Sequence, residues 1–162
     1  MIIVGIDPGT ARMGWAVIQS EKGHITPICY GCIITTNDTT DEIRLKSMYR
    51  ELMNILSLHK PQQVALEDIF FATNAKTVIP VAQARGVILL AAAMANIPVY
   101  SYSPRAVKSA IAGSGTADKS QVTAMVMRIL RIDTPPKPDD TADALAIALT
   151  HAYSYKLKAK TV

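Results

Sequence analysis

Four acidic side chains of this sequence have positions that suit chemistry at a shared site. Asp7 directly follows the apolar residues 2–6, and Glu67 directly follows a second, shorter apolar run. Asp140 and Asp143 lie three residues apart at the start of a predicted helix, so they share one of its faces. Four carboxylates in one place repel one another, and a hard divalent cation such as Mg²⁺ relieves that repulsion. Two such ions about 3.5–4 Å apart suit in-line hydrolysis of a phosphodiester, which is the chemistry that these acids predict.

Each of these acids also has a simpler structural explanation. Asp140 alone is typical of a helix cap, and Asp143 alone is typical of an exposed acid in a first helical turn. The neighbouring acids Asp68 and Asp139 compete for the roles of Glu67 and Asp140. The acid after the first apolar run is harder to explain in this way, because an unpaired carboxylate is costly to bury between apolar residues.

The apolar pattern predicts strands and helices in an order that brings the acids together. Strands are expected at residues 2–6, 14–20, 28–35, 64–66 and 97–100. Helices are expected at residues 41–58, 74–95 and around 122–130, with a last helix that begins at residue 139 or 140. Three opening strands followed by alternating helices and strands predict an α/β fold, with a five-stranded mixed sheet flanked by helices on both faces. If the first and fourth strands are parallel neighbours, Asp7 and Glu67 end about 4.8 Å apart.

Length and composition favour one globular domain. The chain has 162 residues, of which 49% are hydrophobic and 19% are charged, so an intrinsically disordered protein is excluded. We expect one domain over residues 1–157, followed by a basic tail at residues 158–162. The longest apolar run, residues 87–95, is too short for a membrane span, which needs about 20 residues. No basic segment precedes the apolar N-terminus, so no secretory signal is expected and a cytoplasmic location is predicted.

The charge distribution and the cysteine spacing bear on which partners and which metal or redox sites the protein could have. Lys and Arg number 17 against 13 Asp and Glu, and basic residues dominate the segment 105–131. This distribution fits a polyanionic partner, and it fits a solvated helix face equally well.

Cys29 and Cys32 form a C-x-x-C pattern on a predicted strand, where a spacing of three places the two thiols on opposite faces. Without a second pair of ligands, this pattern predicts ordinary buried thiols rather than a metal or redox site.

Five motifs in order resemble those of one family, the RuvC Holliday junction resolvases, or crossover junction endodeoxyribonucleases. The motifs are Gly-Ile-Asp-Pro-Gly at residues 5–9, Gly-Trp at 14–15, Glu-Asp-Ile-Phe-Phe at 67–71, Gln-Ala-Arg-Gly-Val at 83–87 and Asp-Thr-Ala-Asp-Ala-Leu-Ala at 140–146. The resemblance runs from residue 2 to about residue 152. Departures are modest: Met13 and Ala16 replace a common threonine and glycine, and Pro80 interrupts the helix that resembles the family's dimer-forming element.

The resemblance implies an RNase H-like fold and a homodimer with two Mg²⁺-dependent active sites. Each site would hold two Mg²⁺ ions, for which Mn²⁺ may substitute, and each would make one of two symmetric nicks in a four-way DNA junction during homologous recombination and DNA repair. The cut ends would carry a 5′-phosphate and a 3′-hydroxyl. By motif position the catalytic, metal-binding acids are Asp7, Glu67, Asp140 and Asp143. The branch-migration proteins RuvA and RuvB are implied as partners.

The same resemblance implies further residues that contact DNA. Lys119 falls on a family lysine that assists catalysis or DNA binding, and Lys108 falls on a second one. Phe70 is similar to an aromatic residue that stacks on bases near the junction centre, a contact worth about 1–3 kcal/mol. Its simpler explanation is core packing. Arg105, in the same basic segment as the lysines, is a further candidate DNA contact.

Two other function classes are weighed against this one. Residues 113–120 come near the phosphate-binding loop pattern, but Asp118 lies where that pattern needs its second glycine. The actin and sugar-kinase type of ATPase also opens with an Asp-Pro-Gly-Thr turn, yet it needs two such domains to enclose ATP. A non-catalytic DNA-binding module is the third class, and four acids that repel phosphates argue against it.

Overall fold

The computed structural model describes residues 1–69 and 75–159, and it contains one mixed sheet. The strands are β1 (Ile2–Asp7), β2 (Arg12–Glu21), β3 (His24–Ile34), β4 (Gln63–Glu67) and β5 (Val99–Tyr102). They lie in the order β3-β2-β1-β4-β5, antiparallel from β3 to β1 and parallel from β1 to β5. The expected five-stranded mixed sheet is therefore confirmed. The predicted base-stacking residue Phe70 lies outside the described residues.

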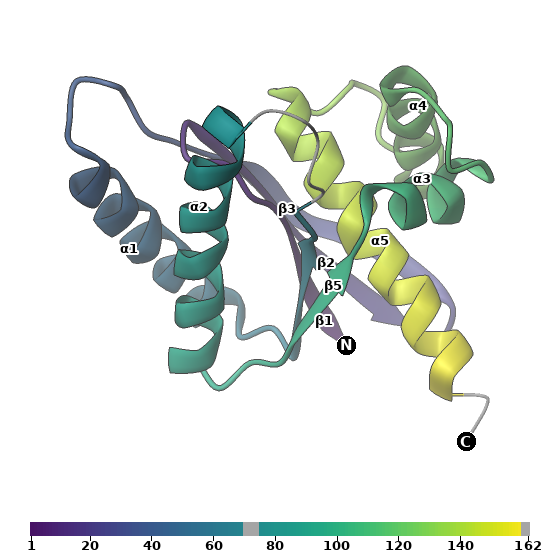
Figure 1. The fold of residues 1–162 in the computed structure, drawn as a ribbon. Coiled ribbons are helices and arrows are strands. Elements are labelled where there is room, and N and C mark those ends of the chain that lie inside the picture. Colours follow the sequence, from purple (N-terminus) through teal and green to yellow (C-terminus); the bar gives the residue numbers. More distant parts are fainter. Residues whose placement is uncertain (70–74, 160–162) are drawn as a thin grey trace.

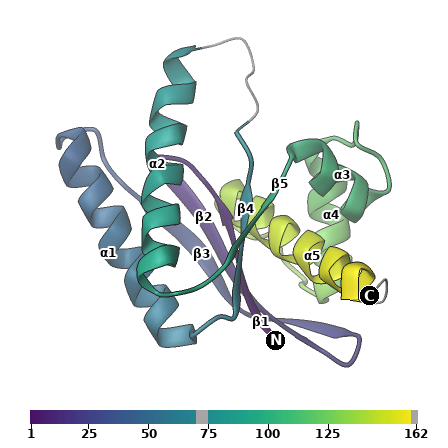
Figure 2. The same cartoon turned by 60° about the horizontal axis from the view of Figure 1, so that its bottom comes forward.

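Helices cover both faces of this sheet, as the sequence predicts. They are α1 (Asp41–His59), α2 (Ala75–Met94), α3 (Pro104–Ala112), α4 (Lys119–Leu130) and α5 (Asp139–Ala159). Figures 1 and 2 show α1 and α2 side by side on one face, with α3, α4 and α5 on the other. None of the helices within the described ranges is both long enough and apolar enough to cross a membrane.

Strand β1 is apolar throughout because its two faces serve two separate cores. Val4 and Ile6 are fully buried in the core that α1 and α2 cover. Ile3 is fully buried in the other core, which α3, α4 and α5 cover. A central strand that is covered on both faces therefore carries a continuous apolar run rather than an alternating one.

Helix α5 lies unusually close to β1. A Cβ atom at Gly5 would lie 2.3 Å from the carbonyl oxygen of Ala144 and 2.7 Å from the Cβ of Ala148. A glycine on the strand and small residues on the helix together remove the side chains that normally separate a helix from a sheet. This close packing fixes the position of α5, whose N-terminal end carries two of the four acids.

Two features of the helices differ from the simplest sequence expectation. Helix α3 has no counterpart among the expected elements, although the Ser103 hydroxyl accepts a hydrogen bond from the Ala106 N–H and Pro104 begins the helix. Val107 and Ile111 lie four residues apart and are buried, so the sequence does carry local signals for this helix that the prediction missed. Helix α2 continues through Pro80, so the proline does not interrupt the helix as the sequence suggests.

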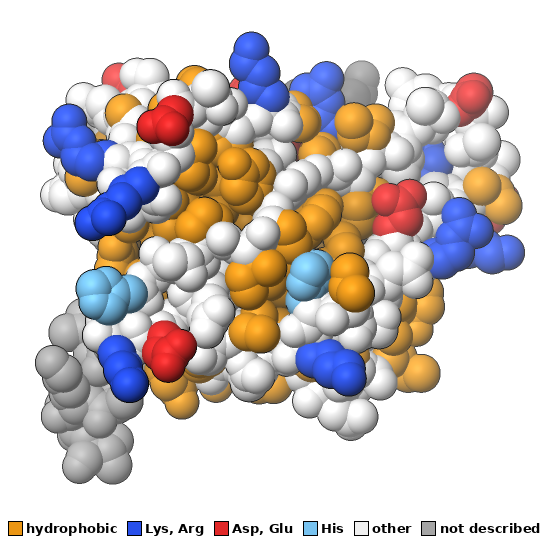
Figure 3. Space-filling model, turned by 180° about the vertical axis from the view of Figure 1, so that it is seen from behind, with side chains coloured by type: hydrophobic (Ala, Val, Ile, Leu, Met, Phe, Trp, Pro, Cys, Tyr) orange, Lys and Arg blue, Asp and Glu red, His pale blue; other side chains and the backbone are white. Residues whose placement is uncertain are grey.

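The edge strand β3 exposes apolar side chains on the side of the molecule opposite to that of Figure 1. Ile28 and Ile34 are 45% and 60% exposed, and Tyr30 is exposed as well. Figure 3 shows apolar side chains near the centre of this view, with acidic and basic groups mixed around them. This side of the molecule therefore lacks the continuous basic surface that a DNA duplex would favour.

We predict that Gly5→Ala lowers the free energy of unfolding by about 2 kcal/mol or more, because the added methyl group must push α5 away from β1. Thermal and urea unfolding followed by circular dichroism would measure this loss. A variant that unfolds at the same denaturant concentration as the parent protein would show that α5 can move at little cost.

Candidate active site

Asp7 is the last residue of β1 and lies between two neighbouring strands. On one side it is paired with Gly14 of β2. On the other side the parallel ladder between β1 and β4 reaches Ile6 and Leu66, so Asp7 and Glu67 end these two strands. The expectation that the two strands are parallel neighbours is confirmed. Both acids therefore leave the sheet at the same edge.

The first turn of α5 lies directly on β2 because Gly14 has no side chain. A Cβ atom at Gly14 would lie 1.9 Å from the carbonyl oxygen of Asp140. This approach brings Asp140 and Asp143 close enough to Asp7 for their charges to raise its pKa. Gly14 is a site residue that sequence analysis missed, and its only signal is its place in the Gly-Trp motif.

The carboxyl groups of the two strand-end acids bind protons more tightly than usual. Burial raises the pKa of Asp7 to about 8, and repulsion from Glu67, Asp143 and Asp140 adds to the shift. Burial also raises the pKa of Glu67 to about 7, with Asp143 as the main repelling charge. Both carboxyl groups therefore keep their protons to a higher pH than an ordinary acid, and such shifted groups often cluster at functional sites.

Lys119 supplies positive charge beside α5. Its Nζ lies 2.8 Å from Asp143 Oδ2 and 3.3 Å from Asp139 Oδ2. Burial raises the pKa of Asp143, and Lys119 offsets part of that shift. For Lys119 itself, partial burial disfavours the charged form, but its two acidic partners outweigh this effect and the pKa is raised.

The start of α4 fixes the position of Lys119. The Asp118 side chain accepts a hydrogen bond from the Gln121 N–H, while Gln121 Oε1 accepts one from the Asp118 N–H. This capping box makes Lys119 the first residue of the helix. It also explains why residues 113–120 only approach a phosphate-binding loop: a carboxylate already occupies the helix N-terminus.

The two neighbouring acids that compete for catalytic roles have other partners. Asp139 is 73% exposed and contacts Lys119, whereas the half-buried Asp140 acts on the buried acid of β1. Asp68 is 47% exposed and forms an ion pair with Arg85. The structure therefore favours Asp140 and Glu67 as the members of the acidic site.

A cavity of about 240 Å³ joins the acids to two basic side chains. Glu67 and Asp143 line it together with Lys108 and Lys119. Apolar side chains complete its walls: Pro104, Val107, Val122 and Ala146. Acids for a cation and lysines for a phosphate thus face the same small space.

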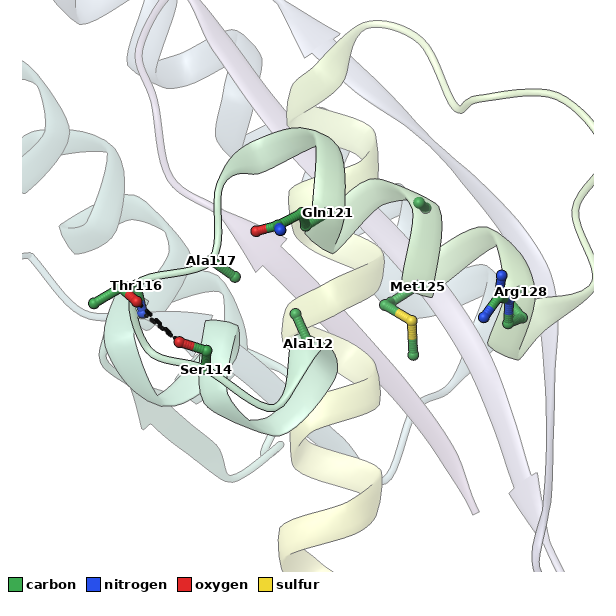
Figure 4. Close-up of a pocket in the computed structure, with 8 residues that line it drawn as sticks. Ala112, Ser114, Thr116, Ala117, Gln121, Met125 and Arg128 are labelled. Carbon is green, nitrogen blue, oxygen red and sulfur yellow. Dashed lines mark hydrogen bonds between the residues drawn. The ribbon is translucent and has the colours of Figure 1, made fainter.

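A larger hollow of about 490 Å³ lies between α3 and α4 and contains none of the four acids. Figure 4 shows Ser114 and Thr116 at one end of it and Met125 and Arg128 at the other. Its lining has a single charged group, Arg128. Size alone therefore does not identify the chemical site of this protein.

The donor atoms fit a hard divalent cation by their chemistry. All four candidates offer carboxylate oxygens, which are the ligands that such a cation prefers. Within residues 1–69 and 75–159, however, no three Asp, Glu, His or Cys side chains are already arranged as a metal-binding group. Among these acids, Asp143 already forms an ion pair with Lys119.

The cysteines offer no competing soft-metal site. Cys29 packs against the core under α1, with its Sγ 3.3 Å from His59 Nε2. Cys32 donates a hydrogen bond to the carbonyl of Ile33. The two thiols are free and have separate surroundings, as the strand spacing predicts.

The candidate DNA contacts fall in different places. Lys108 and Lys119 line the acidic cavity. Arg105 does not line it and packs instead beside Gly115, where a Cβ atom would lie 2.6 Å from the Arg105 Cγ. Of the predicted DNA-contacting side chains that the structure describes, the two lysines are therefore the ones that join the acids.

Arg85 is a further residue that sequence analysis missed at this edge of the sheet. Its guanidinium donates hydrogen bonds to the Glu67 carbonyl, the Asp68 carboxylate and the Ser101 hydroxyl. The only signal for Arg85 is its place in the motif at residues 83–87. Its contact with the end of β4 joins distant segments, and no periodic sequence pattern predicts such a contact.

Comparisons with known proteins identify the family of this chain. A family model described as Crossover junction endodeoxyribonuclease RuvC matches residues 3–151. The protein of that name from Syntrophomonas wolfei is 51% identical over 157 residues, which cover 97% of this chain and 91% of that protein. Its namesake from Desulfitobacterium hafniense is 48% identical, with coverages of 97% and 95%. The solved structure of T. thermophilus RuvC in complex with Holliday junction substrate matches with a TM-score of 0.93 and 34% identity, over 98% of this chain and 96% of that one.

We predict that the metal-free protein loses stability as the pH rises from about 5 to 8. Folded Asp7 keeps its proton up to a pKa of about 8, whereas the unfolded chain releases it near 3.8, so unfolding releases protons in this window and is favoured by rising pH. Asp7→Asn should therefore stabilise the metal-free protein at pH 8 by roughly 2 kcal/mol, measured by urea unfolding in EDTA.

The matched control is Asp133→Asn, which removes an exposed acid outside the cavity. It should leave the pH dependence of unfolding unchanged. Equal stability of Asp7→Asn and the parent protein at pH 8 would contradict the buried, repelled state of Asp7.

Proposed function

The chain belongs to the RuvC family of crossover junction endodeoxyribonucleases, and we propose that its acidic cavity cuts the strands of a four-way DNA junction. The protein is thus a Holliday junction resolvase nuclease of recombination and repair. The observation that carries the proposed mechanism is the convergence of Asp7, Glu67, Asp140 and Asp143 at the end of β1. The relative from T. thermophilus was solved with a Holliday junction substrate, which supports the same substrate for this chain.

The four carboxylates are the residues that would hold Mg²⁺, at two ions per site, with Mn²⁺ as a substitute. When bound, such ions lower the pKa of an attacking water and stabilise charge on the leaving oxygen. In the proposed site the carboxylates would hold the ions that orient the scissile phosphate, and they would give up their bound protons as the ions bind. Water attacks phosphorus and the bond from phosphorus to O3′ breaks, which leaves a 5′-phosphate and a 3′-hydroxyl.

The two lysines of the cavity act on the DNA rather than on the water. Lys119 and Lys108 both line the cavity beside Glu67 and Asp143, where they can contact the negatively charged phosphate of the strand. Lys119 also compensates the charge of Asp143 in the free protein. Arg105, outside the cavity, would contact the DNA backbone further from the cut.

Paired nicks need two active sites, so we include a homodimer in the proposal. Helix α2 offers a surface for it, because Ile79, Leu90 and Met94 are each more than half exposed. Such a row of large apolar side chains on one helix is typical of a surface that another protein covers. RuvA and RuvB are included as partners by resemblance alone.

Family membership favours this function over the two alternatives. The ATPase hypothesis rests on one Asp-Pro-Gly-Thr turn, and the loop at residues 113–120 already has its helix capped by Asp118. A non-catalytic DNA-binding module would gain nothing from four acids that repel phosphates around one cavity. Hydrolysis of ATP without DNA would nevertheless favour the ATPase hypothesis.

We predict that Asp7→Asn abolishes cleavage and retains junction binding. The carboxylate would be lost from the metal site, while affinity depends mainly on basic contacts with phosphates. The test incubates a synthetic four-way junction and a matched linear duplex with the protein in Mg²⁺ or in EDTA. The parent protein should cut the junction in Mg²⁺ only, and the variant should be at least about 100-fold slower. Joint loss of binding and cleavage would indicate a structural role for Asp7.

We predict that Lys119→Ala slows cleavage and weakens the salt dependence of junction binding. Removal of one phosphate contact lowers the slope of log affinity against log salt by about 0.9. Lys46→Ala, which removes an exposed lysine of α1, is the control and should leave both quantities unchanged. Unaltered cleavage by Lys119→Ala over the whole range of salt would exclude the assigned role.

A further inference from the structure

Arg85 connects α2 to the catalytic end of β4 through three hydrogen bonds. Its Nη1 donates to the main-chain oxygen of Glu67 at 2.6 Å. Its Nη2 donates to Asp68 Oδ1 at 2.9 Å and to Ser101 Oγ at 2.7 Å. The guanidinium therefore holds together the last residue of β4, the residue that follows it and a residue of β5.

The part of α2 that carries Arg85 is also held firmly. Ala84 and Ile88, on either side of Arg85 in α2, are fully buried in the core beneath that helix. The Arg85 side chain is itself only 18% exposed. A guanidinium with a fixed base and two anchored nitrogens has little freedom to move, so the atoms that it contacts are held in place.

The carbonyl of Glu67 needs such a partner because the strand ends there. The last backbone pair between β1 and β4 is Ile6 with Leu66, one residue before the acid. Beyond it, the Asp68 N–H donates to the Tyr102 carbonyl, which leaves the Glu67 carbonyl to the guanidinium. The orientation of this peptide group determines the direction in which the strand leaves the sheet, and thus where the preceding side chain projects.

We propose that Arg85 is a positioning residue that holds the end of β4 so that the Glu67 carboxylate faces the acidic cavity. The inference rests on the proposed role of Glu67 as a metal ligand. Arg85 contacts the main chain of Glu67 and neutralises the carboxylate of Asp68, so it acts on the direction of Glu67 rather than on its charge.

Arginine suits this role in a way that lysine does not. A planar guanidinium offers donors in several fixed directions, and it binds the Glu67 carbonyl with one nitrogen while the other binds two side chains. Hydrogen bonds from a charged donor are roughly twice as strong as neutral ones. A lysine at residue 85 would reach one acceptor well and should restore the position only in part.

The experiment compares Arg85→Gln, Arg85→Lys and the control Arg50→Gln, which removes an exposed arginine of α1. Binding of Mn²⁺ to the DNA-free protein is measured by calorimetry, and junction affinity is measured in EDTA. Single-turnover cleavage is measured at saturating junction. Supporting residues around metal ligands typically contribute 10–100-fold to metal affinity or activity, so we expect Arg85→Gln to weaken Mn²⁺ binding and slow cleavage by about tenfold or more. Junction affinity should stay within about twofold, and Arg85→Lys should lie between the parent and Arg85→Gln.

The outcomes separate this inference from the proposed function. Parent-like Mn²⁺ binding and cleavage by Arg85→Gln would overturn the positioning role, as would weakened junction binding with unchanged Mn²⁺ affinity, which would make Arg85 a DNA contact. Failure of the parent protein itself to bind Mn²⁺ or cut the junction would overturn the proposed function instead. If Arg85→Gln does not fold, Ser101→Ala removes one anchor of the guanidinium and should weaken Mn²⁺ binding in the same direction, by about threefold.

Discussion

Partial burial of several carboxylates close to one another is the constraint on which the proposed site depends. Asp7 and Glu67 end neighbouring parallel strands, and α5 adds two more acids above them. Burial, with repulsion between the acids adding to it, raises the pKa of Asp7 to about 8 and that of Glu67 to about 7, so both carboxyl groups hold protons to a higher pH than usual. In the proposed mechanism, cations that bind to these carboxylates would replace the protons, which would couple metal affinity to pH.

The two layers of helices contribute different parts of this site. The layer of α3, α4 and α5 supplies two acids and the lysines of the cavity, and Gly5 and Gly14 allow α5 to lie directly on the sheet. The layer of α1 and α2 supplies no ligand but sends Arg85 to the end of β4. At the sheet edge between the layers, acids, the two lysines of the cavity and the guanidinium that supports β4 lie close together.

Much of this arrangement was predictable from the sequence, because local patterns encode it. The apolar runs before Asp7 and Glu67 predict buried strands that end in an acid, and helical spacing places Asp140 and Asp143 on one face. The order of elements predicts the mixed sheet with helices on both faces.

What the sequence did not predict depends on contacts between distant segments. The role of Gly14 follows from how closely α5 approaches β2, and that of Arg85 from the packing of α2 behind β4. Neither of these tertiary contacts produces a periodic pattern in the sequence. Helix α3 is different, because its Ser-Pro start and the apolar pair Val107 and Ile111 are local signals that the prediction missed. The homodimer came from family resemblance alone.

The most direct test of this account is a calorimetric titration of the metal-free protein with Mg²⁺ at pH 7, repeated in buffers of different ionisation enthalpy. The difference between buffers counts the protons that leave the protein as the metal binds. Because Asp7 and Glu67 hold protons at this pH, the account predicts binding with release of about one proton per chain. Binding without proton release, or no binding at all, would contradict it.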